Sequence, residues 1–326
     1  MIFLNILILL AGFTALVKGA DLFVDGSSAL ARRFRVSGLV IGLTIVAMGT
    51  SLPELSVSTA AALQGSNEIA LSNVVGSNLF NLLVVLGLCA ALHPVPTDRA
   101  VLKRDYPVNL ATTLVVLAFV GGPALFSGRL SGLGMADTAS AVTRPLAALL
   151  MAGFIAYLAV LVISARRNPT PQEDAPEPFS PKRCALQLII GLALIIAGGE
   201  AVVVSAKAIA RAAGMSETLI GLTVVALGTS LPELVTSVVA ARKGETDMAV
   251  GNVVGSNLMN LMFVLGVSAL IHPIGVNLAS VTDLAILSAV SVLCCLFLYT
   301  GRRIDRWEGA VMLALYAADV AFAIIR

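Results

Sequence analysis

The hexapeptide Gly49-Thr50-Ser51-Leu52-Pro53-Glu54 occurs twice in this chain of 326 residues. It returns letter for letter at 228–233, 179 positions later (228 − 49 = 179), and each copy lies inside an otherwise apolar run. A carboxylate in such a run is costly if it faces lipid, and a proline breaks a helix and leaves carbonyl groups without N–H partners. The hexapeptide therefore gathers hydroxyl, carbonyl and carboxylate oxygens, which suit Na⁺, Ca²⁺ and Mg²⁺. Two such clusters in corresponding positions of two halves indicate the ion site of a transporter.

The composition is that of a polytopic, all-α membrane protein. Hydrophobic residues make up 58% of the chain and charged residues only 12%, whereas a soluble domain carries about 25% charged residues. Because a bilayer span takes about 20 apolar residues, the chain is expected to form ten transmembrane helices. The first apolar segment is expected to be a membrane helix rather than a signal peptide. The ten segments are expected near 3–31, 38–63, 69–92, 106–125, 145–165, 184–210, 217–241, 247–271, 282–300 and 307–325.

An internal repeat divides these segments into two halves. With an offset of 179 residues, 33 of the 54 positions in 41–94 are identical to those in 220–273, without a gap. Each half then has five segments, and an odd number gives the second half the opposite orientation in the membrane, so the repeat is expected to be inverted. The expected division is a first half at 1–167 with its repeat at about 38–94, a cytoplasmic linker at 168–183, and a second half at 184–326 with its repeat at about 217–273.

The placement of basic residues predicts the orientation of the chain. If the loops alternate between the two sides, one side receives 15 of the 21 Lys and Arg residues and the other receives four. Since basic residues collect on the cytoplasmic side, both termini are expected to be extracytoplasmic. The protein is expected in the plasma (inner) membrane as a multi-pass protein.

A second motif follows each hexapeptide at the same distance. Asn81 comes 27 residues after Glu54, and Asn260 comes 27 residues after Glu233 (81 − 54 = 260 − 233 = 27). Ser77 lies four residues before Asn81 and so shares its helix face, and the second repeat places Ser256 and Asn260 in the same way. If consecutive segments form a hairpin in each half, the two hairpins would enclose one mid-membrane site with two carboxylates, two amides and several hydroxyls.

The paired G-T-S-L-P-E and G-S-N-x-x-N motifs resemble the α-repeats of the cation/Ca²⁺ exchanger superfamily, and most closely those of prokaryotic sodium/calcium exchanger-like proteins. The resemblance implies broken helices at a central ion site, with Ca²⁺ and Na⁺ as transported substrates and no tightly bound cofactor. It implies that Glu54 and Glu233, with Thr50 and Thr229, coordinate Ca²⁺. The positions implied in Na⁺ binding are Ser51, Ser77, Ser230 and Ser256, with carbonyl groups near Ala47 and Ala226; Asn81 and Asn260 complete the expected set.

Two positions bear on which ions are exchanged. Some members of the superfamily carry Asp where this chain has Asn260, so a third carboxylate, and any K⁺ cotransport associated with it, is in question. The proton-coupled branch typically carries Asn where Thr50 stands, which favours Na⁺ over H⁺ as the counter-ion. Exchange of H⁺ or of another cation for Ca²⁺ in the same fold stays open as an alternative.

The expected function is a secondary antiporter that exchanges Na⁺ for Ca²⁺ by alternating access. A cation channel is a second possibility, although a channel needs several weak sites along a continuous pore and the sequence shows one acidic site and no evident filter. An enzyme is not expected, since no histidine lies near the acidic motifs. Besides the two ions and the lipid bilayer, no partner is expected: neither nucleic acid nor an obligatory protein.

Overall fold

The fold was analysed in a computed structural model that describes residues 2–65, 67–126, 134–135, 137–170, 180–215 and 226–325. Within these residues, 8 helices are long and apolar enough to cross a membrane, and a bent pair, Gly38–Thr50 with Leu52–Leu63, makes up to 9. These spans correspond to nine of the ten expected segments. The remaining one, 217–241, falls partly outside the described residues, because 216–225 are not among them.

The elements follow the expected segments closely and add four π-helical turns and four short strands. The first half contains α1 (Ile2–Phe34), α2 (Gly38–Ile41), η1 (Gly42–Val46), α3 (Ala47–Thr50), α4 (Leu52–Leu63), α5 (Asn67–Phe80), η2 (Asn81–Val85), α6 (Leu86–Leu92), β1 (Val95–Pro96), η3 (Val101–Asp105), α7 (Tyr106–Phe126), β2 (Thr138–Val142) and α8 (Arg144–Arg167). The second contains α9 (Pro181–Ala212), α11 (Ala226–Gly228), α12 (Leu231–Arg242), α13 (Thr246–Leu258), η5 (Met259–Val264), α14 (Leu265–Ile271), β3 (Ile274–Asn277), α15 (Leu278–Gly301), β4 (Arg303–Ile304) and α16 (Arg306–Ile325).

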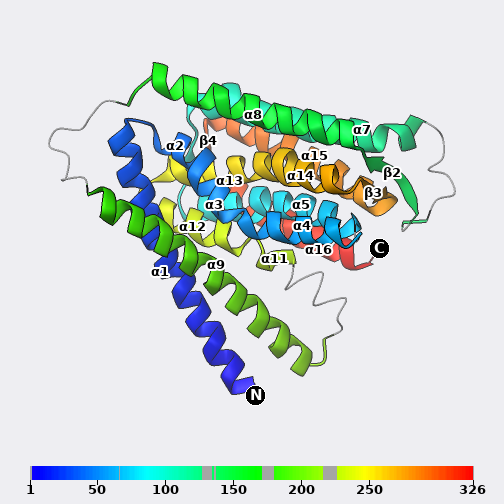
Figure 1. Cartoon of the computed structure of the whole chain (residues 1–326), viewed down its shortest axis with the longest axis horizontal. Coiled ribbons are helices and arrows are strands. Elements are labelled where there is room, and N and C mark those ends of the chain that lie inside the picture. Colours follow the sequence, from blue (N-terminus) through cyan, green and yellow to red (C-terminus); the bar gives the residue numbers. More distant parts are fainter. Residues whose placement is uncertain are drawn as a thin grey trace.

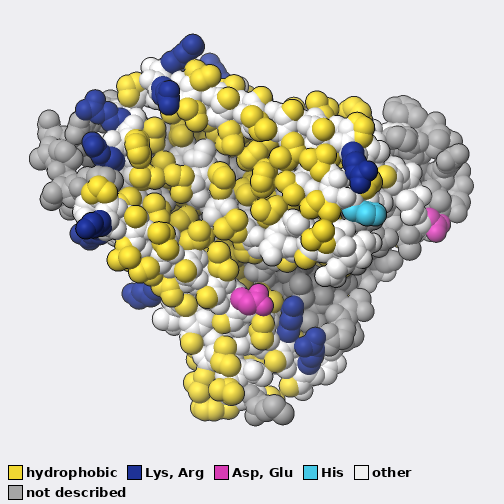
Figure 2. Space-filling model, in the orientation of Figure 1, with side chains coloured by type: hydrophobic (Ala, Val, Ile, Leu, Met, Phe, Trp, Pro, Cys, Tyr) yellow, Lys and Arg dark blue, Asp and Glu magenta, His cyan; other side chains and the backbone are white. Residues whose placement is uncertain are grey.

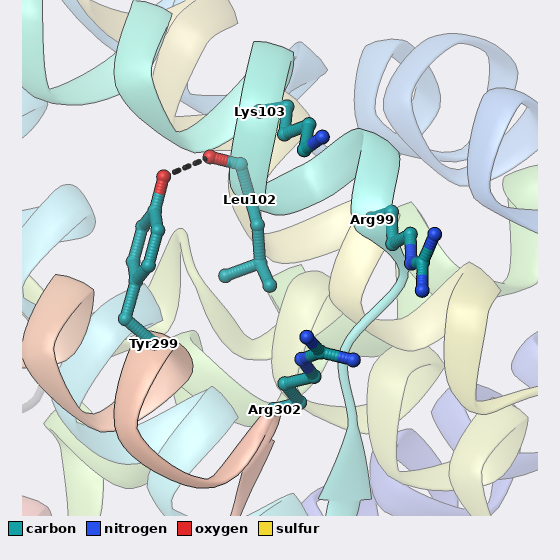
Figure 3. A pocket seen from close by; sticks show the side chains of 5 residues that line it. All are labelled: Arg99, Leu102, Lys103, Tyr299 and Arg302. Atoms are coloured by element: carbon teal, nitrogen blue, oxygen red, sulfur yellow. Dashed lines mark hydrogen bonds between the residues drawn. The ribbon is translucent and has the colours of Figure 1, made fainter.

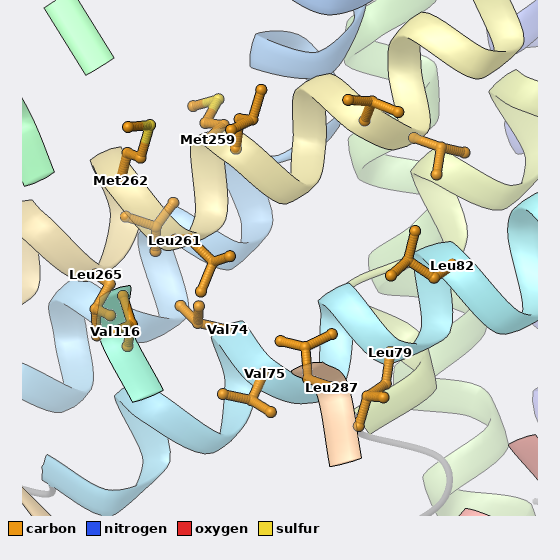
Figure 4. Packing of buried hydrophobic residues seen from close by; sticks show 14 of the residues in the cluster. Val74, Val75, Leu79, Leu82, Val116, Met259, Leu261, Met262, Leu265 and Leu287 are labelled. Carbon is orange, nitrogen blue, oxygen red and sulfur yellow. The ribbon is translucent and has the colours of Figure 1, made fainter. Parts of the chain in front are cut away.

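Broken and hairpin helices occupy the centre of the molecule, and longer helices surround them (Figure 1). Helices α7 and α8 run along one edge, next to α14 and α15, while α1 and α9 pack on each other and cross obliquely on the opposite side. Buried side chains of α5, η2 and η5 meet those of α7 and α15 between these layers; Val74, Leu82, Leu261 and Leu287 among them are at most 1% exposed (Figure 4). The core therefore surrounds the segments that carry the two motifs.

The outer surface is apolar in the way a lipid-facing surface requires. On α8, Leu149, Ile155 and Val162 expose 55%, 64% and 50% of their surface. Figure 2 shows hydrophobic side chains spread over this face of the molecule, with Lys and Arg gathered mainly at its edges. A soluble protein rarely exposes so large an apolar area, so this face is expected to contact lipid acyl chains.

Two short strand pairs and a backbone hydrogen bond connect loops that are distant in sequence. Strand β1 pairs antiparallel with β4, and β2 pairs antiparallel with β3. The N–H of Thr170 donates to the carbonyl oxygen of Arg35 at 2.9 Å. When successive loops are assigned to alternate sides of the membrane, each of these contacts joins two loops on the same side. The sequence patterns did not predict the strands, because segments of two to five residues are too short for a periodic signal.

Glycines allow α1 and α9 to approach closely where they cross. A Cβ atom at Gly12 would lie 3.0 Å from the carbonyl oxygen of Gly198, and one at Gly19 would lie 2.8 Å from that of Gly191. The repeat relates these positions, since 12 + 179 = 191 and 19 + 179 = 198. Small residues let the backbones of membrane helices touch, so these four glycines set the distance between α1 and α9.

Adjacent glycines on α9 provide a matched test of this crossing. A Cβ atom at Gly198 would meet the backbone of α1 at 2.8 Å, whereas at Gly199 the nearest atom, in Pro232, lies 3.8 Å away. We expect Gly198→Ala to destabilise the protein by about 1–3 kcal/mol, the usual cost of overpacking, and Gly199→Ala to change stability little. Thermal unfolding of both variants in detergent measures the difference, and equal unfolding temperatures would contradict the close crossing.

Candidate cation site

The two hexapeptides lie where a short helix ends and another begins. Ser51 closes α3, and α4 starts at Leu52 with Pro53 and Glu54 in its first turn. Proline is tolerated there because the first N–H groups of a helix have no partner within the helix. The two parts of the first span are bent by 47° at this break. In the second repeat Ser230 precedes α12, again with the glutamate in the first turn, so both carboxylates sit at the start of a half-helix.

Hydrogen bonds cross between the repeats at the two glutamates. The hydroxyl of Ser51 donates to Oε1 of Glu233 at 3.0 Å, and the hydroxyl of Ser230 donates to Oε1 of Glu54 at 3.1 Å. All four residues have 0% of their surface exposed. Each repeat therefore supplies a hydroxyl to the carboxylate of the other, and the structure brings both glutamates into one buried polar cluster.

Ser77 and Asn260 extend this network. The Ser77 hydroxyl donates to Oε1 of Glu54 at 3.3 Å, and its oxygen lies 2.9 Å from the hydroxyl of Ser230. The Asn260 amide donates to the same Ser77 oxygen at 3.0 Å and to Oδ1 of Asn78 at 3.1 Å. A serine of one repeat thus links a glutamate of its own half to an amide of the other.

The remaining predicted polar residues contact this network or lie next to it. The Thr50 hydroxyl donates to Oδ1 of Asn252 at 3.1 Å and lies 3.5 Å from the Ser256 hydroxyl. Thr229 donates to Oδ1 of Asn73 at 3.4 Å. Asn81 does not bond either glutamate; its amide donates to Oδ1 of Asn257 at 3.1 Å. The Ala47 carbonyl accepts the N–H of Ser51 at 3.0 Å, and Ala226 begins α11, although its side chain is not among those described.

Two asparagines that the sequence analysis did not assign to the site hold the hairpins together. Asn73 donates to the Ser58 hydroxyl at 2.9 Å and to the Glu54 carbonyl at 3.3 Å. Asn252 makes the equivalent bonds in the second repeat, at 2.9 Å to Ser237 and 3.4 Å to the carbonyl of Glu233. The asparagine, the serine and the glutamate of this arrangement are identical in the two repeats. This identity was the sign in the sequence that the asparagines have a role, because loss of their bonds would free the backbone carbonyl of the glutamate.

The helices that carry Asn81 and Asn260 are widened at these residues. The π-helical turn η2 begins at Asn81, and η5 spans Met259–Val264 and contains Asn260. A π turn inserts an extra residue into a helix and is common at functional sites. The two amides therefore lie where the regular i→i+4 bonding pattern is interrupted, which residue spacing alone does not indicate.

Four buried oxygen atoms in this cluster have no hydrogen-bond donor among the described residues: Oε2 of Glu54, Oε2 of Glu233, Oδ1 of Asn81 and Oδ1 of Asn260. All four residues are 0% exposed. Buried acceptors in proteins nearly always have a partner, and carboxylate and amide oxygens are ligands of hard cations. Buried carboxylate and amide oxygens from two repeats, surrounded by helices that are apolar enough to cross a membrane, are the arrangement expected of a transporter for hard cations.

Comparison with known proteins identifies the family. The sequence model of the family described as sodium/calcium exchanger protein matches residues 4–163 and 184–325. The chain is 37% identical over 318 residues to the putative antiporter CaxA of Alkalimonas amylolytica, with 94% of each chain covered. It is 35% identical over 342 residues to the sodium/calcium exchanger MaX1 of Methanosarcina acetivorans, with 98% of each covered. A solved structure of the sodium-calcium exchanger NCX_Mj, soaked with Na⁺ and Ca²⁺, superposes with a TM-score of 0.82 at 34% identity and covers 98% of this chain and 99% of that one.

The protein therefore belongs to the sodium/calcium exchanger family. Members of this family are membrane transporters and not enzymes, as the sequence predicted. The resemblance stated from the two motifs is confirmed over both halves of the chain.

Proposed function

We propose that this protein is a secondary antiporter that exchanges Na⁺ for Ca²⁺ at the site between Glu54 and Glu233. The observation that carries the proposal is the set of four buried acceptor oxygens for which the described part of the chain offers no donor, two of them on carboxylates and two on amides. Cations bound between the repeats would satisfy these oxygens, whereas further hydrogen-bond acceptors would not. The names of the relatives, sodium/calcium exchanger and antiporter, support the same ions and the same mode of transport.

The charges at the site match a single calcium ion. Two carboxylates supply two negative charges, and Ca²⁺ accepts six to eight oxygen ligands at about 2.3–2.6 Å. Hydroxyl, amide and carbonyl groups complete such a shell or hold Na⁺ ions in its place. The proposed ligand set is Ala47, Thr50, Ser51, Glu54, Ser77, Asn81, Ala226, Thr229, Ser230, Glu233, Ser256 and Asn260.

Competition for these oxygens provides a reason for obligatory exchange. Two buried carboxylates without a cation are costly to hold within a membrane, so the empty carrier should change conformation reluctantly. The loaded carrier is closer to neutral and can open to either side. The ions shift the balance between two conformations only to the extent that they bind one of them more tightly than the other.

The proposed framework is ten transmembrane helices in two inverted halves, 1–167 and 184–326, joined by the linker at 168–183.

Ion flux in proteoliposomes tests the proposed function. Purified protein should take up ⁴⁵Ca²⁺ when Na⁺ is trapped inside the vesicles, and uptake should stop when Na⁺ is equal on both sides. A pH gradient in place of the Na⁺ gradient should not support uptake. Ca²⁺ uptake without any counter-ion gradient would identify a channel, and uptake driven by the pH gradient would identify H⁺ as the counter-ion.

The charge distribution predicts the orientation of the protein in the plasma membrane. We expect both termini and the loop at 64–68 to be extracytoplasmic and the linker at 168–183 to be cytoplasmic, because 15 of the 21 basic residues would then lie on the cytoplasmic side. Single cysteines placed in a variant without its four native cysteines can be labelled with a membrane-impermeant maleimide in intact cells. Labelling of Gln64→Cys but not of Lys182→Cys is expected, and the reverse pattern would contradict the orientation.

A further inference from the structure

A basic pocket lies away from the cation site, at the end of α15 and beside η3. It has a volume of about 390 Å³ and is lined by Arg99, Leu102, Lys103, Tyr299 and Arg302 (Figure 3). Figure 3 shows Arg99 and Arg302 extending toward one another from different segments of the chain, with Lys103 on the adjoining turn. The volume falls within the range of about 300–1,000 Å³ that is usual for small-ligand pockets.

The three basic side chains differ from their neighbours in having no acidic partner among the described residues. Arg104, next to Lys103, pairs with Asp105 at 2.7 Å, and Arg303, next to Arg302, pairs with Asp305 at 2.8 Å. Arg99, Lys103 and Arg302 make no ion pair with a described carboxylate. The pocket therefore has three positive charges without a described carboxylate to balance them, and an anion bound among them would lower their mutual repulsion.

A backbone hydrogen bond connects the two segments that carry Arg302 and Arg99. Arg302 closes α15 with φ 52° and ψ 23°, the left-handed region in which glycine is the usual residue. Its carbonyl oxygen accepts the N–H of Thr97 at 2.9 Å, which ties the end of α15 to the segment that carries Arg99.

Exposed aromatic residues indicate that the pocket lies at the level of the membrane surface. Tyr299 is 52% exposed and donates its hydroxyl to the carbonyl of Leu102 at 2.7 Å. Trp307, at the start of α16, is 61% exposed and packs edge-on against Phe297, with ring centroids 5.8 Å apart. Exposed Trp and Tyr side chains gather at the membrane–water interface, and the ring of Tyr299 and the side chain of Leu102 give the pocket an apolar wall beside its charges.

We infer that this pocket binds the phosphate of an anionic phospholipid headgroup. A phosphate accepts hydrogen bonds from two arginines and a lysine at once, and basic pockets between membrane helices on the cytoplasmic side recognise anionic lipids. The apolar wall would contact the glycerol backbone and the start of an acyl chain, which a free phosphate ion lacks. The inference depends on this end of the protein lying at the membrane surface, and not on which cations are exchanged.

Native mass spectrometry of the detergent-purified protein, titrated with phosphatidylglycerol or phosphatidylcholine, tests the inference. Each basic group near an anionic lipid contributes about a fivefold gain in affinity, so Arg99→Gln/Lys103→Gln/Arg302→Gln should weaken phosphatidylglycerol binding by about a hundredfold. The matched control Arg166→Gln/Lys182→Gln/Arg183→Gln removes the same charges at exposed positions outside the pocket, and should weaken binding by less than about threefold. Phosphatidylcholine binding should be weak and unchanged by either set.

Three results would overturn the inference. They are an equal loss of affinity for phosphatidylglycerol in the two triple variants, equal binding of the two lipids by the unchanged protein, and displacement of phosphatidylglycerol by millimolar inorganic phosphate. The last result would identify a site for free phosphate. The single variant Lys103→Gln, at an exposed position, should lose about fivefold in affinity and keeps the test decisive if the triple variant does not fold.

Discussion

Replacement of Glu54 or Glu233 by glutamine is expected to reduce Na⁺-driven Ca²⁺ exchange to near background. Glutamine keeps the shape of glutamate and an oxygen that can accept the hydrogen bond from the hydroxyl of Ser51 or Ser230. It removes one of the two negative charges that balance Ca²⁺. Loss of one partner from a buried charge pair costs about 3–5 kcal/mol, which corresponds to a loss of a hundredfold or more in affinity. The initial rate of ⁴⁵Ca²⁺ uptake in proteoliposomes measures the effect.

The two variants should lose activity to a similar extent, because the glutamates make reciprocal contacts. Each accepts a serine hydroxyl from the other repeat, and each keeps a second carboxylate oxygen without a donor among the described residues. Glu200→Gln is a matched control on α9, where the side chain is exposed, and it should retain exchange. Monodisperse elution in detergent verifies folding. Near-normal exchange in either site variant would contradict a shared Ca²⁺ site and would favour a glutamate that only caps a broken helix.

Asn260→Asp is expected to make the stability of the protein strongly dependent on cations. The Asn260 amide now donates to Ser77 and to Oδ1 of Asn78, and its own Oδ1 has no donor among the described residues. An aspartate would lose both donated bonds, would place a negative charge next to the Asn78 oxygen, and would add a third carboxylate to the site. Thermal unfolding in Ca²⁺, in Na⁺ and in a chelator should show a clear loss of stability without cations, and the ion dependence of exchange should change.

Asn277→Asp serves as a control for the chemical change itself. Asn277 caps α15 by accepting the N–H of Ser280 at 2.8 Å, and Asp caps helices as well as Asn does. This variant should therefore unfold and exchange like the unchanged protein. If Asn260→Asp also leaves the ion dependence of stability and of exchange unaltered, Asn260 does not lie beside the bound cation.

The doubled motifs predicted the centre of the molecule well. A polar hexapeptide with a proline in an apolar run indicates a broken helix, and its exact recurrence relates two such breaks. The structure brings Glu54 and Glu233 into one network through Ser51 and Ser230. It also supports the hairpins, since Asn73 and Asn252 join consecutive helices within each repeat.

Features that depend on three-dimensional packing were not predictable in the same way. The glycine contacts between α1 and α9 involve residues more than 170 positions apart, and a glycine in a membrane helix is too common to indicate a partner. The π turns at Asn81 and Asn260 were not predicted, because a single extra residue in a helix leaves no clear periodic signal in the sequence. The role of Asn73 and Asn252 required the hairpin geometry, although their identity in both repeats was visible.

The reciprocal bonds between Ser51 and Glu233 and between Ser230 and Glu54 have a consequence for the origin of this chain. A half-length ancestor with one copy of the hexapeptide could not have completed the network alone, because the serine and glutamate that pair come from different copies. Such an ancestor would have needed a second copy of itself to complete the network, and every mutation would then have changed both halves of the site at once. With both copies in one chain, each half can change separately, while the bonds between serine and glutamate still depend on both hexapeptides.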